Sequence, residues 1–398
     1  MIVRSLHFEG YRNLQTGSLT PVTGVNVLYG ENAQGKTNLL EALWLFTGGK
    51  SFRGSRDGEL VGFGREQARL LLHFEAAGRE QEAELTITKR RQAVLNGVTQ
   101  PSPSRLAGQF CAVVFSPADL SLVREGPEAR RRFLDAAYCQ LRPGYIATLS
   151  DYHRALAQRN ALLKSGPLGP GAGELLEVWD RKLARSGGYI LAARNRYTAR
   201  LAQAAGALYQ GLSGGREALA LSYRRTADPA GEESVSPLIP PLSVGEEAQR
   251  LYRLLCERRE IDQAAGFTTA GPHRDDLLIS INALPARTYG SQGQQRSAAL
   301  ALKLAEAALL EEATGEKPVA LLDDVMSELD AARQDYILNR IRDWQVFITC
   351  CESGTVLRLD RGNRNSRTWQ IRSGALNEEE KGENGDVSAS GSGSSGSE

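Results

Sequence analysis

The sequence lacks any long uninterrupted run of apolar residues. Of its 398 residues, 41% are hydrophobic and 24% are charged, a mixture typical of globular proteins. The apolar stretches fall short of the ~18 residues that a membrane-spanning helix needs. The first strand-like stretch, Met1 to Gly10, lacks the charged and then apolar layout of a secretory signal. We therefore expect a cytoplasmic protein without a membrane partner.

Cysteine and histidine are also scarce. The five cysteines and four histidines form no C-x-x-C pair and no spacing typical of metal ligands. An odd, scattered cysteine count suits a reducing compartment better than a disulfide scaffold. No internal repeat and no sustained heptad pattern occurs, which excludes a long coiled coil.

A strong charge of one sign is missing as well, because the formal net charge is only +1. The distribution is nevertheless uneven. Residues 121–200 carry 14 Lys and Arg against 7 Asp and Glu, whereas Asn377 to Glu398 carries six acids against one lysine. The middle of the chain could therefore face a polyanion. The acidic, Gly/Ser-rich end, residues 376–398, is expected to be disordered.

Hydrophobic periodicity predicts a mixed α/β chain. The expected helices are Lys36 to about Thr47, a long helical region from Glu128 to about Gly211 that is broken at Gly166–Gly171, and Gln294–Thr314. A proline-rich loop is expected over Pro237–Leu242. The expected strands are Ile2–Glu9, Val22–Tyr29, Leu70–Phe74, Glu82–Thr88, Ala93–Asn96, Ala112–Phe115, Leu277–Ile281, Val319–Leu322 and Val346–Thr349.

A phosphate-binding motif follows the second of these strands. Its eight residues fit G-x-x-x-x-G-K-[ST] at every fixed position, and a predicted helix begins within it. Glycines at the first and sixth positions let backbone N–H groups point at phosphate oxygens, and the helix N-terminus adds positive charge. The lysine should bridge the β- and γ-phosphates of ATP, and the hydroxyl should ligate Mg²⁺. The motif consists of Gly30, Glu31, Asn32, Ala33, Gln34, Gly35, Lys36 and Thr37.

A carboxylate pair ends the buried strand Val319–Leu322. In a phosphate-loop sheet we expect this strand to lie beside the strand that precedes the loop. Asp323 should then hold Mg²⁺, and Asp324 should polarise the attacking water as the catalytic residue. Taken alone, the pair could equally cap a helix.

A third motif opens the helix before that strand. Ser291, Gly293 and Gln294 form S-x-G-Q at its start, and Ser327 to Asp330 follow the carboxylate pair. This order resembles that of ABC ATPases, in which the signature serine and glycine bind the γ-phosphate held by the other subunit. The resemblance therefore implies a nucleotide site shared between two copies in an ATP-dependent homodimer. A simple N-capped helix would explain Ser291 but not the spacing to Asp323.

Two departures from the ABC pattern imply slow hydrolysis. Asp324 stands where these proteins usually carry Glu, and Cys350 and Cys351 run through the place of their usual histidine. Slow hydrolysis suits a switch better than a motor.

The chain resembles the RecF family of bacterial recombination mediators from its start to about Gly374. Besides the phosphate motif, the resemblance rests on three blocks: Phe115–Asp135, Gly271–Leu277 and Leu322–Asp330. It implies an α/β fold, an ABC-type phosphate-loop ATPase head like that of Rad50, with a helical subdomain inserted in the second lobe. The expected segments are the first lobe (1–120), the helical insertion (121–265), the completion of the ATPase lobe (266–375) and the tail (376–398).

The resemblance also implies a function. Such proteins bind ATP, dimerise on it and bind duplex DNA and single-strand/duplex junctions. They hydrolyse ATP weakly with stimulation by DNA, and with RecR, and in many bacteria RecO, they help to load RecA at single-strand gaps. A DNA-tethering scaffold with the same head, as in structural-maintenance ATPases, is the alternative. A metabolic phosphotransferase is opposed by the signature helix.

Several further residues have a candidate role in the nucleotide site, in DNA binding or in the core. Arg12 and Asn13, and also Arg53, could reach the nucleotide or its loop. Lys89, Arg90, Arg91, Arg130 and Arg131 are candidate DNA contacts, although a solvated or salt-bridged face is the better interpretation of the Arg130 cluster. Core packing is favoured over base stacking for Tyr138, Tyr145 and Tyr152. His273 should lie in a structural turn, and Asp119 could substitute for the missing Q-loop glutamine.

Overall fold

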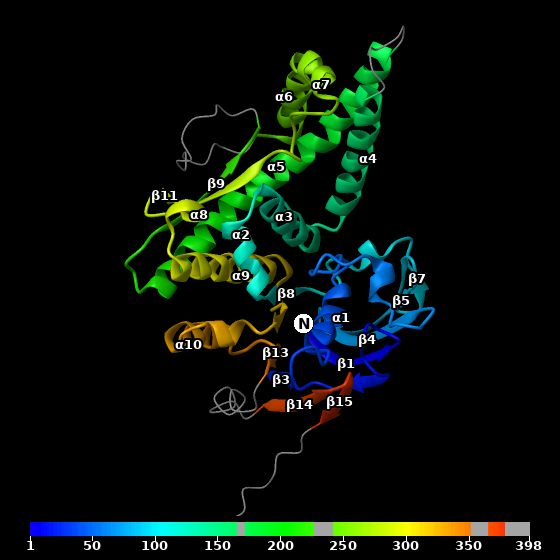
Figure 1. Cartoon of the computed structure of the whole chain (residues 1–398), viewed down its shortest axis with the longest axis vertical. Coiled ribbons are helices and arrows are strands. Elements are labelled where there is room, and N and C mark those ends of the chain that lie inside the picture. Colours follow the sequence, from blue (N-terminus) through cyan, green and yellow to red (C-terminus); the bar gives the residue numbers. More distant parts are fainter. Residues whose placement is uncertain (165–171, 227–241, 352–364, 379–398) are drawn as a thin grey trace, which may run out of the picture.

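The computed structural model describes residues 1–164, 172–226, 242–351 and 365–378. The predicted helix break at Gly166–Gly171, most of the predicted proline-rich loop and most of the predicted tail lie outside this part. Two six-stranded sheets form the ATPase-like head, and a group of helices extends from it (Figure 1). No helix in the described ranges is long and apolar enough to cross a membrane.

The first sheet is antiparallel, in the order β2-β1-β4-β5-β6-β7. Its strands alternate buried and exposed side chains, as expected where one face packs and the other is solvated. The segment around Lys89 and Arg90 forms a hairpin turn, because Ile87 pairs with Arg91. The strands are β1 (Ile2–Glu9), β2 (Gly17–Leu19), β4 (Ala68–Ala76), β5 (Arg79–Ile87), β6 (Arg91–Leu95) and β7 (Val98–Thr99).

The second sheet carries the phosphate loop, in the order β15-β14-β3-β13-β12-β8. It is parallel except for β15, and β3, β8, β12 and β13 are buried on both faces. The prediction that the carboxylate strand lies beside the phosphate-loop strand is wrong, because β13 separates β12 from β3. The strands are β3 (Val25–Tyr29), β8 (Ala112–Phe115), β12 (Val319–Leu322), β13 (Val346–Cys350), β14 (Ser366–Arg372) and β15 (Ala375–Glu378).

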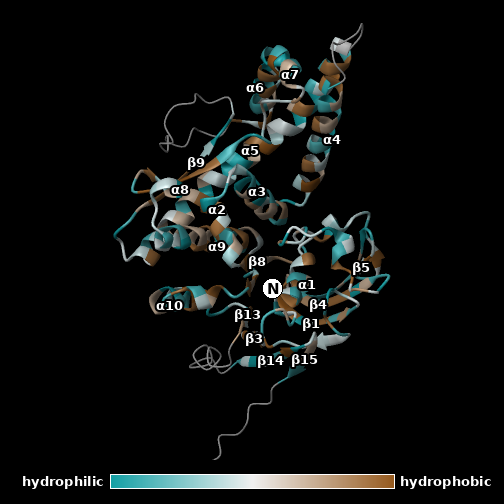
Figure 2. Cartoon of the chain, in the orientation of Figure 1, coloured by the Kyte–Doolittle hydropathy of each residue, from teal (hydrophilic) through white to brown (hydrophobic). Residues whose placement is uncertain are grey.

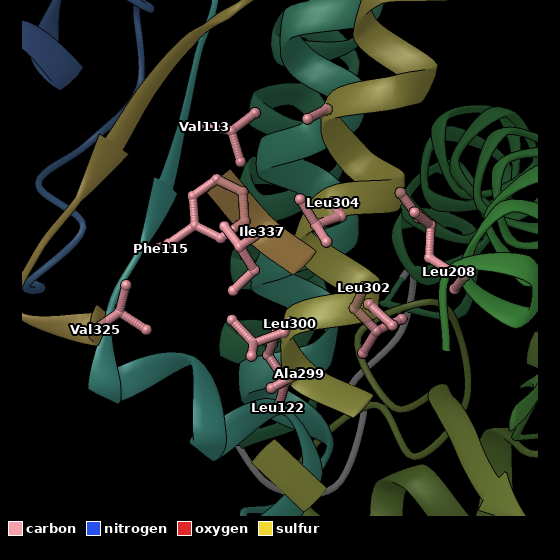
Figure 3. Close-up of a cluster of buried hydrophobic side chains, with 14 of the residues drawn as sticks. Val113, Phe115, Leu122, Leu208, Ala299, Leu300, Leu302, Leu304, Val325 and Ile337 are labelled. Carbon is pink, nitrogen blue, oxygen red and sulfur yellow. The ribbon is translucent and has the colours of Figure 1, made fainter. Parts of the chain in front are cut away.

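Helices cover both faces of this sheet. On one face α1 (Lys36–Leu45) and the first sheet pack on Leu28, Leu321 and Phe347. On the other face α9 (Gln292–Thr314) packs on β8, where Val113 and Phe115 belong to one cluster with its leucines (Figure 3). The sheet is therefore the middle layer of the head.

A helical arm rises from the second lobe. It contains α3 (Pro127–Leu141), α4 (Gly144–Lys164), α6 (Val244–Glu257), α7 (Arg259–Ala265) and the 42-residue α5 (Ala172–Ser213). At 1.5 Å per residue, α5 is about 60 Å long, so it reaches from the arm to α9 (Figure 1). Hydrophobic and hydrophilic residues alternate along α4 as in a helix packed on one side (Figure 2).

A small sheet joins the arm to the head. Strand β9 (Leu219–Arg224) pairs with β10 (Asp276–Ile281), which pairs with β11 (Leu284–Pro285). The predicted insertion, 121–265, therefore shares a sheet with the segment that follows it. The remaining helices are α2 (Ser121–Arg124), α8 (Ala286–Tyr289), α10 (Ala331–Arg340), η1 (Asp57–Leu60), η2 (Pro103–Leu106), η3 (Pro117–Leu120) and η4 (Val325–Glu328).

The tyrosines of the basic region belong to the protein interior. Tyr145 and Tyr152 are buried in the arm core, and Tyr138 packs edge-on against Tyr145 with ring centroids 4.9 Å apart. The interpretation as core packing is confirmed, and base stacking is excluded for the two buried rings.

Candidate functional site

The phosphate loop connects β3 to α1 and depends on its glycines. Gly30 has φ 154° and Gly35 has φ 118°, conformations that favour glycine. A Cβ on Gly30 would lie 2.3 Å from the carbonyl oxygen of Ile371, and one on Gly35 would lie 2.7 Å from Leu14 Cδ2. These contacts leave no room for a side chain, so the loop keeps the shape that exposes the first N–H groups of α1.

Lys36 is buried at the mouth of this loop. Its Nζ donates to the carbonyl oxygens of Gly30 at 2.5 Å and Glu31 at 3.1 Å, and lies 3.5 Å from Cys351 Sγ. The ammonium is thereby held across the loop, where a phosphate oxygen can exchange for a carbonyl partner.

Thr37 meets the carboxylate strand. Its hydroxyl donates to Asp323 Oδ1 at 2.8 Å, and Thr349 Oγ1 donates to the same oxygen at 3.0 Å. Burial raises the pKa of Asp323, and the hydroxyls of Thr37 and Thr349 oppose that rise. The contact forms despite the intervening β13, because the carboxyl ends of parallel strands share one edge of the sheet.

The Thr37 and Asp323 oxygens fit a magnesium ion. Mg²⁺ takes hard oxygen ligands and is usually held by one or two carboxylates together with substrate phosphates. Among the described residues, no group of three or more His, Cys, Asp or Glu side chains could hold a metal by itself. The donor set therefore suits a metal that arrives with a nucleotide.

Asp324 follows in a left-handed conformation, with φ 54°. Its N–H donates to Thr349 Oγ1 at 2.9 Å, and its carbonyl accepts from Ser327. The side chain is half-buried, and its two oxygens lie 3.8 and 3.9 Å from Cys351 Sγ. This backbone turn directs the carboxylate away from the Asp323 contact and toward the end of β13.

The two cysteines have different surroundings. Cys351 is exposed between Asn32, Lys36 and Asp324, with its Sγ 3.1 Å from Asn32 Oδ1. Cys350 is buried, and burial raises the pKa of its thiol to about 11. Only Cys351 therefore belongs to the site.

Arg12 borders the loop through an ion pair. Its side chain lies 2.7 Å from the buried carboxylate of Glu41 on α1 and donates to Ser55 Oγ at 2.8 Å. Tyr11 also donates to Glu41, and burial, followed by this carboxylate, raises the Tyr11 pKa. Glu41 was missed by sequence reasoning, although a glutamate in an otherwise apolar helix face is a visible signal.

Asn13 and Arg53 also contact the loop and its helix. Asn13 donates to the carbonyl of Ala33 at 3.0 Å and accepts from Asn38 at 2.7 Å. Arg53 donates to Asn38 Oδ1 at 2.8 Å. All three predicted residues are thus brought beside the loop.

The β14–β15 hairpin, which was not predicted, is hydrogen-bonded to the phosphate loop. In the turn between β14 and β15, the Ser373 N–H donates to Gln34 Oε1 at 2.5 Å and the Gly374 N–H donates to the Gln34 carbonyl at 3.1 Å. Its sequence signal is the buried alternation of Trp369 and Ile371 before a glycine turn. Strand β15 ends at Glu378, beyond the expected start of the tail.

The signature segment forms a separate helix terminus. Ser291 caps α9 by accepting from the Gln294 N–H, and the Gln294 side chain accepts from the Ser291 N–H. Gln294 Nε2 donates to Glu217 at 2.7 Å. Within the described ranges, neither side chain hydrogen-bonds a residue of the chain's own phosphate loop. The exposed N-terminus of α9 is therefore a second possible anion site.

Two arginines tie this segment to Ser327–Asp330. Arg296 of α9 pairs with Glu328 at 3.2 Å and donates to its carbonyl. Arg333 of α10 pairs with Asp330, which also caps α10, and donates to Ser297 Oγ at 2.8 Å. These contacts join Ser327–Asp330, which follows the carboxylate pair, to the signature segment.

The candidate DNA contacts divide into exposed and buried side chains. Lys89 and Arg90 are exposed at the β5–β6 turn, whereas Arg91 pairs with Asp57 at 2.9 Å and is buried. Arg130 is buried in an ion pair with Asp276 at 2.7 Å, and Arg131 donates to the Asp275 carbonyl. We therefore interpret Arg91 and Arg130 as members of structural ion pairs and not as DNA contacts.

Asp119 and His273 both have structural partners. Asp119 accepts from the Ser116 N–H at 2.7 Å, and burial raises its pKa to about 6. His273 lies in a turn where Nδ1 is 2.6 Å from the Tyr152 hydroxyl and Nε2 is 3.1 Å from the Thr268 carbonyl. The structural role proposed for the His273 turn is confirmed.

The chain is similar to known proteins over most of its length. Residues 2–372 match the model of the RecF/RecN/SMC N-terminal domain. The chain is 40% identical over 376 residues to the DNA replication and repair protein RecF of Gloeobacter violaceus, covering 91% of this chain and 98% of the relative. It is 38% identical over 354 residues to that of Ruminiclostridium cellulolyticum, covering 88% and 92%. The chain belongs to the RecF family.

A solved structure extends the likeness to three dimensions. It is that of the recombination mediator protein RecF-ATP in the RecFOR pathway, 36% identical, with a TM-score of 0.84 over 95% of this chain and 98% of that one. The RecF-family fold confirms the ABC-type ATPase head with a helical subdomain in the second lobe.

Proposed function

We propose that this RecF-family protein is an ATP-dependent DNA-binding switch that acts as a recombination mediator. In this proposal it binds ATP with Mg²⁺, dimerises on it, binds DNA in that state and hydrolyses ATP weakly, with stimulation by DNA. The single observation that carries the proposal is that the chain has two helix N-termini suited to a phosphate. One is the start of α1 with Lys36, and the other is the signature end of α9, whose Ser291 and Gln294 side chains hydrogen-bond no residue of that loop in the described part of the chain.

The chain's own loop supplies one half of the site. The N–H groups at the start of α1 and the Lys36 ammonium bind the β- and γ-phosphates, while Asn13 and Arg12 border the nucleotide. Thr37 and Asp323 are the residues that would hold Mg²⁺, which neutralises charge on the phosphates when bound.

The partner copy supplies the other half. Ser291 and the Gly293 N–H sit at a helix N-terminus, and the glycine has no side chain of its own to keep a phosphate oxygen away. Closing two copies head to tail would place each signature segment over the other's γ-phosphate. The γ-phosphate then becomes the group that holds the dimer together.

Hydrolysis would end this state. Asp324 accepts a proton from the attacking water, and its carboxylate is shorter by one methylene than the glutamate usual in ABC proteins. Cys351, beside it, provides no ring nitrogen to orient that water or the γ-phosphate. ATP hydrolysis should therefore be slow, which suits a switch.

DNA and protein partners complete the proposal. Relatives are described as DNA replication and repair proteins and as a recombination mediator of the RecFOR pathway. We extend this to the chain: it binds duplex DNA and single-strand/duplex junctions in the cytoplasm and, with RecR and RecO, promotes RecA loading at gaps. Lys89 and Arg90, which are exposed and form no ion pair with the described part of the chain, are the proposed phosphate contacts.

A bulky cation introduced at the signature segment tests the shared nucleotide site. Ser291→Arg should leave ATP binding by the monomer within about twofold, because the loop is intact, yet abolish ATP-driven dimerisation measured by light scattering. Ser186→Arg, on the arm, is the matched control and should dimerise normally. A normal dimer of the Ser291→Arg protein would refute the shared site.

A further inference from the structure

Arg333 lies against the signature glycine. Apart from the adjoining residues and backbone of α9 itself, a Cβ on Gly293 would have only the Nη2 of Arg333 within 4 Å among the described residues, at 3.6 Å. The guanidinium comes from the first turn of α10, just after Ser327–Asp330. A positive charge therefore stands at the second anion site, from an element that the signature motif does not include.

Two of the three nitrogens of this guanidinium have fixed partners. Nε donates to Ser297 Oγ at 2.8 Å, and Nη1 pairs with Asp330. Both contacts orient the group. Within the described ranges, no hydrogen bond or ion pair joins Nη2 to another residue, and the side chain is 29% exposed. Its two N–H donors are therefore available on the side that faces Gly293.

Neighbouring acids offset this charge, but none of them occupies Nη2. Asp330 is paired with Arg333, Glu328 with Arg296, and Glu217 accepts from Gln294 and Tyr209. The Tyr209 hydrogen bond is the main cause of the lowered pKa of Glu217, with burial opposing it and Arg333 contributing a smaller part. Each of these acids thus already has a donor, whereas Nη2 has donors to spare.

We propose that Arg333 acts in trans, as a cation that binds the γ-phosphate held by the partner copy alongside Ser291 and Gly293. The inference rests on the shared site proposed above and adds a residue to it. A guanidinium N–H to a phosphate oxygen is a strong, charge-assisted hydrogen bond. It would make dimerisation depend on the γ-phosphate and stabilise charge on it during hydrolysis.

The polar contacts of Arg333 favour action in trans over action in cis. The two residues that its side chain binds, Ser297 and Asp330, both belong to the signature side. The polar neighbours of the chain's own loop are instead Asn13, Asp323, Cys351 and the β14–β15 turn.

Single substitutions distinguish a direct phosphate contact of Arg333 from a purely structural link between α10 and α9. Arg333→Gln should keep ATP binding by the monomer within about twofold but weaken ATP-driven dimerisation and slow hydrolysis at least about tenfold. Arg333→Lys should recover part of the loss, because it keeps the charge. Ser297→Ala removes the anchor on α9 and keeps the guanidinium, so it should stay within about threefold of the unmodified protein. Arg340→Gln, two turns along α10, is the matched control and should behave normally.

One result of this series would overturn the inference. If Ser297→Ala loses as much activity as Arg333→Gln, Arg333 is only a staple between α10 and α9. Normal dimerisation and hydrolysis by Arg333→Gln would also overturn it.

Mixing two impaired variants tests whether Arg333 acts on its own loop or on that of the partner copy. Arg333→Gln mixed with Lys36→Met should recover hydrolysis, because the Lys36→Met copy supplies an intact Arg333 to the loop of the other copy. Ser291→Arg mixed with Lys36→Met is the reference pair. Recovery by both pairs supports action in trans. Recovery by the reference pair alone overturns the role of Arg333 and leaves the proposed function standing. Recovery by neither pair overturns the shared site itself.

Discussion

Asp324 combines an unusual backbone conformation with a carboxylate just after strand β12. Its φ of 54° is a region where Asp and Asn are among the few tolerated side chains. The position therefore limits which residues can stand there. Asparagine keeps both the backbone preference and the shape of the side chain while removing the ability to take a proton.

Asp324→Asn should therefore separate binding from hydrolysis. We expect turnover to fall about 100-fold, since the proton acceptor is lost, while ATP-driven dimerisation persists because Lys36 and Thr37 are unchanged. Phosphate release and light scattering measure the two effects. Asp151→Asn on α4 is the control, and an unchanged rate for Asp324→Asn would exclude this residue as the base.

Two arginines of α3 show that residue type alone does not determine whether a side chain is buried. Arg130 and Arg132 lie two positions apart, yet Arg130 is buried against Asp276 and Arg132 is exposed. At helical spacing the two point in different directions, and only the presence of β10 beside α3 determines which one is covered.

At the scale of elements, the turn between α7 and β10 joins the arm to the small sheet. His273 is held there by the Tyr152 hydroxyl and the Thr268 carbonyl. Burial lowers its pKa to about 4, and the positive charges of Arg274 and Arg131 add to the effect.

The stability of the protein should therefore fall in acid. Because the folded-state pKa of His273 is below its unfolded value of about 6.5, the unfolded state binds more protons as pH falls from about 6.5 to about 4. The contribution lost over that window is about 3 kcal/mol. Urea unfolding at pH 7, 5.5 and 4.5 measures it, and His273→Gln should lose less stability over the same window. An equal loss for the variant would assign the pH dependence to other groups.

Elements with strong local signals were predicted well. The phosphate loop, Ala112–Phe115, Val319–Leu322 and the end of α9 at Gly315 are found where periodicity, glycine and flanking polar residues placed them. The β14–β15 hairpin and β9 were missed, because their short strands are stabilised by pairing with residues far away in the chain.

At the scale of the whole molecule, the proposed DNA-binding state depends on charges spread over a large surface. The net charge is only +1, so an overall field does not attract DNA. Local clusters such as the β5–β6 turn must supply the contacts.

DNA binding by the ATP-bound dimer should therefore weaken steeply with salt. Replacing Lys89 and Arg90 by glutamine should lower affinity for all sequences about equally. It should also reduce the slope of log K against log salt by about one unit for each phosphate that is no longer neutralised. Fluorescence anisotropy over a salt series measures this. Arg79→Gln, at the exposed start of β5, is the control, and an unchanged slope for the double variant would remove these two residues from the interface.

The sequence by itself determined the chemistry of this protein. The glycines, Lys36, Thr37 and the carboxylate pair each act through local backbone shape or their own functional group, and such requirements are written in neighbouring residues. Only the tertiary structure decided which distant groups meet: that Asp323 reaches Thr37 across β13, that Ser373 and Gly374 close the loop, and that Arg333 lies beside Gly293. These contacts depend on strand order and helix packing, which arise from the whole buried core and not from any one segment of the chain.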